Sequence, residues 1–228
     1  MRNFKWESSY AVGASAGGLV SIFGQNLVQG AAGVTSAASL PLPYALGGTS
    51  VTIGGRAAPL LAVAKVNGVQ QINLQVPPEL AGQSQLPVVV SSAGFRSDPA
   101  KVDVLAAQPG VFVGAGGQPI VLHADYSFVS VASPASPGEV VVIYCTGLGV
   151  TDPWVDAGVA APTALTAVQP LVEIGGVSAP VLFSGLAPGF VGLYQVNVQI
   201  PDSAQAGMAN LVLSVNGSAS VPVQVALR

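Results

Sequence analysis

Apolar and polar residues alternate in two short stretches of the chain that have nearly the same sequence. QQINLQVP occupies residues 70–77, and LYQVNVQIP occupies residues 193–201. Successive side chains of a β-strand point to opposite faces, so this period of two predicts two strands, each with one apolar face and one face of uncharged amides. The residues predicted to point inward are Ile72, Leu74 and Val76 in the first stretch, and Tyr194, Val196, Val198 and Ile200 in the second.

The repetition extends beyond these two strands. Four blocks recur in the same order, at offsets of 120 to 124 residues: GLVSIFGQNL with GEVVVIYCTGL, VTIGGRAAPLL with VEIGGVSAPVL, QINLQVP with QVNVQIP, and SSAGFRSDP with SVNGSASVP. The Gly-Gly pair that both copies place between apolar runs is typical of a tight hairpin turn, because glycine adopts positive φ without steric penalty. The chain is therefore a tandem duplication, in which features shared by both copies are scaffold and features of one copy are the better functional candidates.

The fold class follows from the strand pattern. Short β-branched runs alternate with Gly and Pro clusters, and no helical stripe of ten or more residues is present. We predict an all-β protein of two tandem immunoglobulin-like β-sandwich domains with an extra β-hairpin and linker between them. The predicted ranges are 1–8 for an N-terminal extension, 9–107 for the first sandwich, 108–137 for the hairpin and Pro/Ser linker, and 138–228 for the second sandwich.

Several motifs together resemble a known family. LVSIFGQNL, PLPYALGGTSVTIGG, QINLQVP, IYCTGLG and LAPGFVGLYQVNVQIP are similar, in this order, to a C-terminal domain of acidobacterial proteins of the Solibacter type. The resemblance implies a fold like the IPT/TIG immunoglobulin-like group, a secreted or cell-surface location, and no catalytic residues. The chain departs from the family pattern at Ala16-Gly17-Gly18, where a Pro-Gly step is usual, and at Cys145, where alanine is common. Residues 1–7 carry too little apolar sequence for a signal peptide.

Composition excludes several classes of function. Hydrophobic residues make up 50% of the chain and charged residues only 7%, so it can bury a core and is not a disordered chain. The net charge of −3, with few and scattered basic residues, argues against nucleic acid as a partner. The uncharged stretch 8–55 is interrupted by glycine and proline, which argues against a transmembrane segment.

One serine motif fits the pattern of a hydrolase. GASAG at residues 13–17 places Ser15 in a G-x-S-x-G sequence, and Asp98 or Asp103 and His123 follow in the order Ser, Asp, His. The motif requires a strand before the serine and a helix after it, whereas a Gly-Gly step and a second strand follow Ser15. We therefore expect no catalytic residue, and a serine hydrolase at Ser15 is kept only as a distant alternative.

The remaining polar candidates also favour structural roles. His123 is the only histidine, so it makes no two-histidine metal site, and it is expected at a strand end. Asp152 and Asp156 flank Trp154 and offer too few ligands for calcium, so an Asp-Pro turn with a packed indole is the preferred interpretation. Cys145 is expected to be a small buried hydrophobe. We predict no metal and no cofactor.

Aromatic residues are the best candidates for contact with a ligand or partner. We single out Phe4, Trp6, Tyr126 and Trp154. The leading hypothesis is a non-catalytic extracellular structural or adhesion module, and the alternative is a carbohydrate-binding module that uses exposed aromatics. Expected partners are the protein itself, other cell-surface proteins or a polysaccharide. Self-assembly would use neutral strand edges, and MRNFKWE (1–7) would either add as a strand to a neighbouring copy or pack on its own domain.

Overall fold

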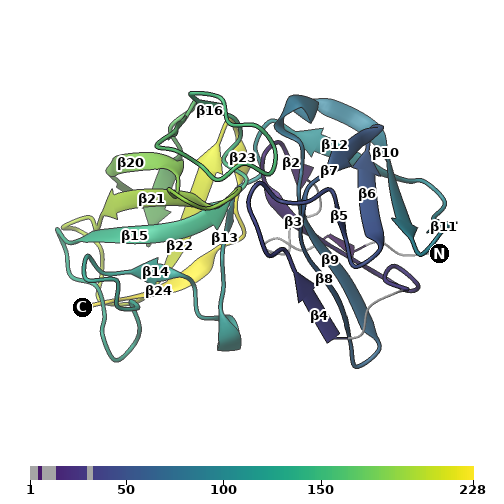
Figure 1. Ribbon diagram of the computed structural model, residues 1–228. Coiled ribbons are helices and arrows are strands. Elements are labelled where there is room, and N and C mark those ends of the chain that lie inside the picture. Colours follow the sequence, from purple (N-terminus) through teal and green to yellow (C-terminus); the bar gives the residue numbers. More distant parts are fainter. Residues whose placement is uncertain (1–4, 7–13, 30–32) are drawn as a thin grey trace.

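The computed structural model describes residues 5–6, 14–29 and 33–228. It shows an all-β protein with two short 3-10 segments, Pro78–Leu80 and Ala115–Gly117. The strands form four sheets, which pack as two immunoglobulin-like sandwiches that lie side by side (Figure 1). The predicted fold class is confirmed.

The first sandwich contains two sheets. One has the order β1 (Lys5–Trp6), β3 (Leu19–Gly24), β9 (Val69–Gln75), β8 (Leu60–Val66) and β4 (Gly33–Ser36). The other has the order β2 (Ala14–Ser15), β12 (Ala100–Leu105), β10 (Gln83–Ser92), β6 (Thr49–Ile53) and β5 (Ala45–Leu46), with β11 (Phe95–Arg96) on β10 and β7 (Arg56–Ala58) on β6. These strands pair antiparallel, except that β2 runs parallel to β12.

The second sandwich repeats this plan. Its larger sheet has the order β13 (Gly110–Val111), β15 (Val140–Thr146), β21 (Tyr194–Gln199), β20 (Val181–Leu186), β17 (Leu165–Thr166) and β16 (Thr151–Asp152), with β14 (Val121–Leu122) on β15. The smaller sheet has the order β19 (Val177–Ala179), β18 (Leu171–Ile174), β22 (Gly207–Val215) and β23 (Ser218–Ala219), with β24 (Val223–Leu227) on β22.

Details of the hydrogen bonding recur in both copies. Both copies have a register shift at the same place, between Leu60 and Ala62 in β8 and at the equivalent position in β20. In both, a serine hydroxyl after the last hairpin accepts a backbone N–H at 3.0 Å: Ser97 from Val90, and Ser220 from Leu213. A local serine acceptor of this kind satisfies a backbone donor that the sheet leaves unpaired.

The register of the first strand differs by one residue from the sequence alignment of the two copies. Gln75 and Gln199 are equivalent residues, and their side chains donate to the carbonyls of Gly17 and Gly138 respectively. Gly17, and not Gly18, therefore corresponds to Gly138. The one-residue error arose because a Gly-Gly pair offers two equally good matches to a single glycine.

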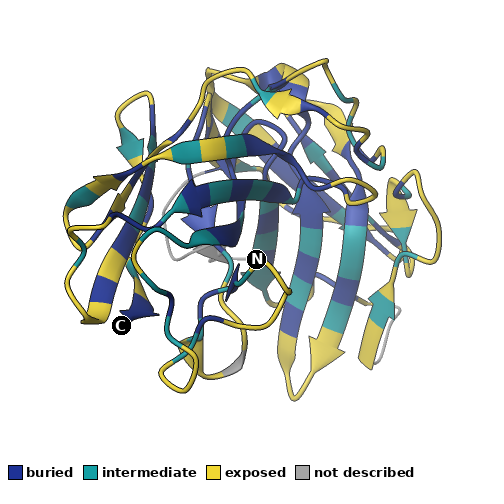
Figure 2. Cartoon of the chain, turned by 90° about the vertical axis from the view of Figure 1, so that its left-hand side faces the viewer, coloured by how far each residue is buried: buried dark blue, intermediate teal, exposed yellow. Residues whose placement is uncertain are grey.

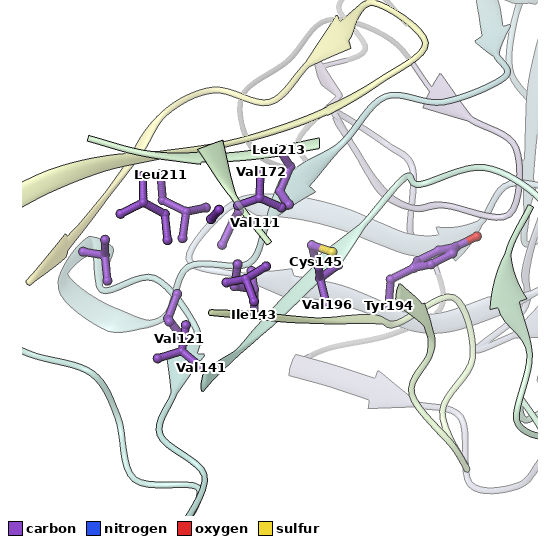
Figure 3. Close-up of a cluster of buried hydrophobic side chains, with 14 of the residues drawn as sticks. Val111, Val121, Val141, Ile143, Cys145, Val172, Tyr194, Val196, Leu211 and Leu213 are labelled. Atoms are coloured by element: carbon purple, nitrogen blue, oxygen red, sulfur yellow. The ribbon is translucent and has the colours of Figure 1, made fainter. Parts of the chain in front are cut away.

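Each sandwich has its own core, made of the residues that the alternating pattern selected. Buried and exposed positions alternate along the strands (Figure 2). The inward-pointing residues are all buried: Ile72, Leu74 and Val76 in one sandwich, and Tyr194, Val196, Val198 and Ile200 in the other. Cys145 lies near Ile143 and Val196 in the second core (Figure 3), where burial raises the pKa of its thiol. The expected role of Cys145 as a buried hydrophobe is confirmed.

The amide stripes are part of the scaffold. Gln71 donates to Asn73 at 2.6 Å in the first copy, and Gln195 donates to Asn197 at 2.9 Å in the second. The next glutamine in each stripe donates to a backbone carbonyl, as described above for Gln75 and Gln199. Side-chain amides carry both donors and acceptors, so they satisfy one another along the strand without burying charge.

The segment between the two copies is built onto the second sandwich. It turns at Gly114, whose N–H donates to Gln118 at 2.7 Å, and its strands β13 and β14 pair with β15. Ala135, in the Ala-Ser-Pro stretch, is buried and forms a parallel bridge with Leu227. At the N-terminus, β1 pairs with β3 of its own domain. The described part of the N-terminal segment therefore packs on its own domain, which is the second of the two arrangements considered for residues 1–7.

Side chains and backbone groups of both domains meet at a hydrogen-bonded junction. Gln75 accepts the N–H of Gly158 at 2.7 Å while it donates to Gly17. The Thr146 hydroxyl accepts the N–H of Leu19 at 2.8 Å, and the N–H of Leu42 donates to the carbonyl of Gly158 at 2.8 Å. Within the part of the chain that is described, the protein has no helix of the length and apolar character needed to span a membrane.

Candidate functional site

A hairpin of the segment between the copies, residues 121–129, is the main candidate. Its arms are joined by hydrogen bonds from Val129 N–H to Val121 and from His123 N–H to Ser127, both 2.9 Å. Its first arm is β14, which pairs with β15 and so fixes the hairpin to the edge of the larger sheet. This hairpin follows the first copy and precedes the repeated blocks of the second, so it satisfies the criterion for a functional feature.

Tyr126 lies in the turn of this hairpin and is the most exposed aromatic residue of the second domain. Its φ of 65° is unusual for a residue with a side chain, and its exposed fraction is 68%. The hairpin that carries Tyr126 is fixed to β15, the strand of Tyr144, by the pairing of Val121 with Ile143. Burial is the main cause that raises the pKa of the Tyr144 hydroxyl, and the charge of Tyr126 adds to the shift.

Tyr144 belongs to the outer face of its sheet. Its neighbours along the strand, Ile143 and Cys145, are fully buried, whereas Tyr144 is half-buried. Tyr144 pairs across the sheet with Gln195, which begins the amide stripe of the second copy. The result is a surface on which aromatic rings adjoin uncharged hydrogen-bonding groups.

An ion pair fixes the base of the hairpin. His123 Nδ1 contacts the Glu139 carboxylate, and His123 Nε2 lies 3.1 Å from the carbonyl oxygen of Ser133. The other Glu139 oxygen accepts the N–H of Ser136 at 2.8 Å. An open hollow of about 450 Å³ beside the hairpin is lined by His123, Ser133 and Glu139, together with Asp125 and Arg228. The group of charged residues at this hollow contrasts with the rest of the chain, where charge is sparse.

The pKa values at the hollow shift in the directions that favour charge. The hydrogen bond to Glu139 raises the pKa of His123, against the opposing effect of burial. Burial alone would raise the pKa of Glu139, but the hydrogen bonds from His123 and Ser136 outweigh it and lower that pKa. The Ser127 hydroxyl and N–H lower the pKa of Asp125. His123 and Glu139 therefore form an ion pair over the pH range between their pKa values.

The side chains of Ser133, His123 and Glu139 contact one another in the spatial order of a hydrolytic triad. Their hydrogen bonding opposes that role. The Ser133 hydroxyl is 3.3 Å from His123 Nε2. The same nitrogen lies closer to the Ser133 carbonyl, an acceptor, so it is best used as an N–H donor. A histidine with both nitrogens protonated cannot accept a proton from serine. The arrangement holds the loop 123–139 in place.

The ion pair makes a prediction for the dependence of stability on pH. The folded pKa of His123 lies above its usual 6.5, so its contribution is complete below pH 6.5 and is lost as the pH rises through the raised value. That of Glu139 lies below its usual 4.5, so its contribution is present above pH 4.5 and is lost as the pH falls through the lowered value. We expect His123→Gln to reduce the free energy of unfolding most between these limits. Urea denaturation of both proteins from about pH 4 to 9 measures this difference, and a difference that is constant with pH would contradict it.

Ser15 is not part of this site. It is 4% exposed in β2, and a methyl group added at Gly147 would lie 2.9 Å from its hydroxyl. After Ser15 the chain makes a turn and enters β3, so the helix that a nucleophile elbow requires does not follow. Asp103 accepts hydrogen bonds from the backbone and side chain of Gln85. Ser15 lies in β2 of the first domain, whereas the side chain of His123 bonds to Glu139 and Ser133 of the segment that precedes β15.

Trp154 lies at the domain junction, apart from Tyr126. The expectation of a packed indole is wrong: Trp154 is 50% exposed, and its Nε1 donates to Asp156 at 2.9 Å. Its loop instead contacts the first domain, where the Tyr44 hydroxyl lies 3.5 Å from the carbonyl of Ala157. The pocket beside Trp154 has a volume of about 20 Å³, room for about one water molecule and not for a ligand.

The other predicted contacts are not placed together. Phe4 lies outside the described residues, and for Trp6 only the backbone, in β1, is described. Among the described residues no three His, Cys, Asp or Glu side chains gather as a metal site would require. The sequence analysis missed Tyr144 and Glu139. In the corrected register, Tyr144 corresponds to Phe23 of the first copy and Glu139 corresponds to Gly18. A comparison of the two copies in that register would have indicated both residues as features of the second copy alone.

Comparisons with known proteins give only distant structural likeness. No family model and no curated protein matches the chain. Among solved structures, the chain is similar to SGBP-B from a xyloglucan utilization locus of Bacteroides uniformis (13% identity, TM-score 0.31) and to SGBP-B of a Bacteroides ovatus mixed-linkage glucan utilization locus (13%, 0.36). These matches cover 99% and 97% of the chain but 48% and 45% of the solved structures, so the chain spans about half of their length.

Smaller tandem structures match over most of their own length. Domains 5–6 of the S-layer protein SbsC show 13% identity and a TM-score of 0.27, with 99% of this chain and 96% of that one covered. The titin Ig tandem A164-A165 shows 9% identity and a TM-score of 0.25, with 95% and 92% covered. At these scores the likeness carries no argument about function.

Proposed function

We propose that the protein is a non-catalytic adhesion module, located outside the cell or at its surface, whose second domain binds polysaccharide. The observation that supports the proposal is the exposed Tyr126, held in the turn of a hairpin that is fixed to β15 and lies outside the repeat. The extracellular location rests on the family resemblance of the repeated motifs. The absence of catalysis is supported by the hydrogen bonding of His123 and the burial of Ser15.

The chemistry of the surface suits a sugar chain. The faces of aromatic rings offer large, rigid apolar area, and the tyrosine hydroxyl adds a polar group at the edge. Gln195, which pairs with Tyr144 across the sheet, places a side chain with a hydrogen-bond acceptor on the same outer face. The ordered hairpin reduces the entropic cost of binding, because its turn is already closed by hydrogen bonds.

The proposal is tested by Tyr126→Ala. We expect affinity electrophoresis in gels that contain neutral plant or bacterial polysaccharides to show binding that weakens about fivefold, since an aromatic contact of this kind contributes about 1 kcal/mol. Phe95→Ala is the matched control, because Phe95 has the same exposed fraction, 68%, but lies in the first domain. Equal binding by the two variants and the wild type, or no retardation by any polysaccharide, would exclude this function for the surface.

Self-assembly is a second candidate, favoured by the edge strand β4. Strand β4 ends its sheet, pairs only with β8 among the described strands, and has no charged residue. Proteins normally protect such edges with charge, because unpaired N–H and C=O groups template further strands.

We expect the apparent mass from light scattering to rise with protein concentration if β4 mediates assembly. Val34→Lys, which places a charge at a residue that is 64% exposed on β4, should then keep the protein monomeric. Removal of residues 1–7 is the control for a contribution of the N-terminal segment. A wild-type protein that stays monomeric at high concentration in low and high salt contradicts assembly.

A further inference from the structure

A second hollow lies on the opposite sheet of the second domain. It has a volume of about 600 Å³ and is formed where the Gly175-Gly176 turn meets the beginning of β22. The polar side chains of Ser203, Gln205 and Asn210 contribute to its lining, with Gln224 of β24. The hollow shares no lining residue with the one beside the 121–129 hairpin.

The hollow depends on one difference between the two copies. In the first copy, Leu86 packs over the equivalent turn, so that a methyl group added at Gly54 would lie 3.0 Å from the leucine side chain. The repeat places Ala209 at the position of Leu86. A methyl group added at Gly175 would lie 3.7 Å from Ala209, an ordinary contact. The smaller side chain leaves open the space that leucine fills in the first copy.

The lining is polar but uncharged. The repeat replaces Arg56 of the first copy by Val177, and Lys101 by Gln224. Gln224 donates its amide hydrogen to the Asn210 side chain, which holds both amides in one orientation. Met208 adds an apolar, adaptable surface that is 54% exposed. Fixed amides beside an apolar patch recognise ligands that present hydroxyl groups and apolar C–H faces together.

We infer that this hollow is a binding site for a neutral saccharide. An anionic ligand would find no cation in the lining, and a cation would find no carboxylate. Uncharged sugar hydroxyls, in contrast, match the donors and acceptors of Asn210, Gln224 and Ser203. The inference does not rest on binding at Tyr126, because the two surfaces belong to different sheets of the domain.

The first test is Ala209→Leu, which should fill the hollow without harm to the fold because the first copy has leucine at this position. Backbone amide shifts in NMR are followed while cellohexaose, xylohexaose, mannohexaose and maltohexaose are added separately. We expect at least one of these sugars to shift the amides of Met208 and Asn210 and the side-chain amide of Gln224, and the variant to bind about tenfold more weakly. An oligogalacturonate is the charged control and should not shift them.

Further variants separate the possible outcomes. Gln224→Lys restores the first-copy residue at an exposed position and should also weaken binding. It therefore provides the test if Ala209→Leu fails to fold. Tyr126→Ala should leave these shifts unchanged, so failure of the polysaccharide proposal and failure of this inference are distinguishable. The inference is overturned if none of the neutral sugars shifts these amides, or if both substitutions at the hollow leave binding unchanged.

Discussion

Replacement of Gly147 by alanine is expected to destabilise the protein by about 3 kcal/mol or more, as a left-handed backbone and a steric clash act together. Gly147 directly follows β15 and has a φ of +79°, a conformation that costs a residue with a side chain about 1–2 kcal/mol. An added methyl group would also lie 2.0 Å from the carbonyl oxygen of Gln108. That carbonyl is backbone, so it cannot move aside as the end of a flexible side chain would.

Gly176→Ala separates the two causes. Gly176 has nearly the same φ, +78°, but an added methyl group would meet nothing within 4 Å. We therefore expect this control to lose only about 1 kcal/mol, the cost of the backbone conformation. Urea denaturation followed by circular dichroism gives both free energies. Equal losses in the two variants would show that the chain relaxes around residue 147, so that the added methyl group does not clash with the Gln108 carbonyl.

Removal of the Gln75 side chain is expected to have the second largest effect. Gln75 is 6% exposed, and its amide satisfies the Gly17 carbonyl of the first domain and the Gly158 N–H of the second. Gln75→Ala leaves both backbone groups without their partner, at a cost of about 1–3 kcal/mol for each buried group. Because one of the two bonds joins the domains, we also expect a single unfolding transition to separate into two.

The duplication provides the matched control. Gln199 is the equivalent residue of the second copy, and it makes only the intradomain bond, to Gly138 at 3.0 Å. Gln199→Ala should therefore cost about half as much and leave the shape of the transition unchanged. Tryptophan fluorescence and circular dichroism, followed together in urea, report whether the domains unfold at one midpoint. Coincident transitions in Gln75→Ala would mean that its interdomain bond contributes little.

The parts of the fold that follow from local pattern were predictable. The inward positions of β9 and β21 were correct because one strand face must be buried, and a shift by one residue would expose all of them. The duplication itself needed only the order of the blocks. The first strand was misaligned by one residue because Gly17 and Gly18 are chemically identical in the sequence, and the contacts with Gln75 in the fold distinguish them.

The candidate site was less accessible to sequence reasoning. Tyr126 was selected as an aromatic, but its attachment to the larger sheet of the second domain comes from the pairing of β14 with β15. The partner of His123 is Glu139, which a hairpin and a loop separate from it in sequence. The Asp-Pro context of Trp154 predicted a packed turn, but half of its side chain is exposed. Its loop contacts the first domain through Ala157 and Tyr44, which are far apart in sequence. Such contacts between distant residues leave no periodic signal.

The pairing of β24 has a mechanical consequence. β24 is bonded to β22 along five residue pairs, and on its other side Ala135 pairs with Leu227 and accepts the N–H of Arg228 at 3.0 Å. A pull directed along β24 loads these bonds in shear, so that they must break together and not one after another as in a hairpin opened from its end. Under tension the lifetime of the second sandwich is governed by its unfolding rate. The Ala-Ser-Pro stretch, which holds Ala135 in place, thereby acts as a clamp on the strand that bears the load.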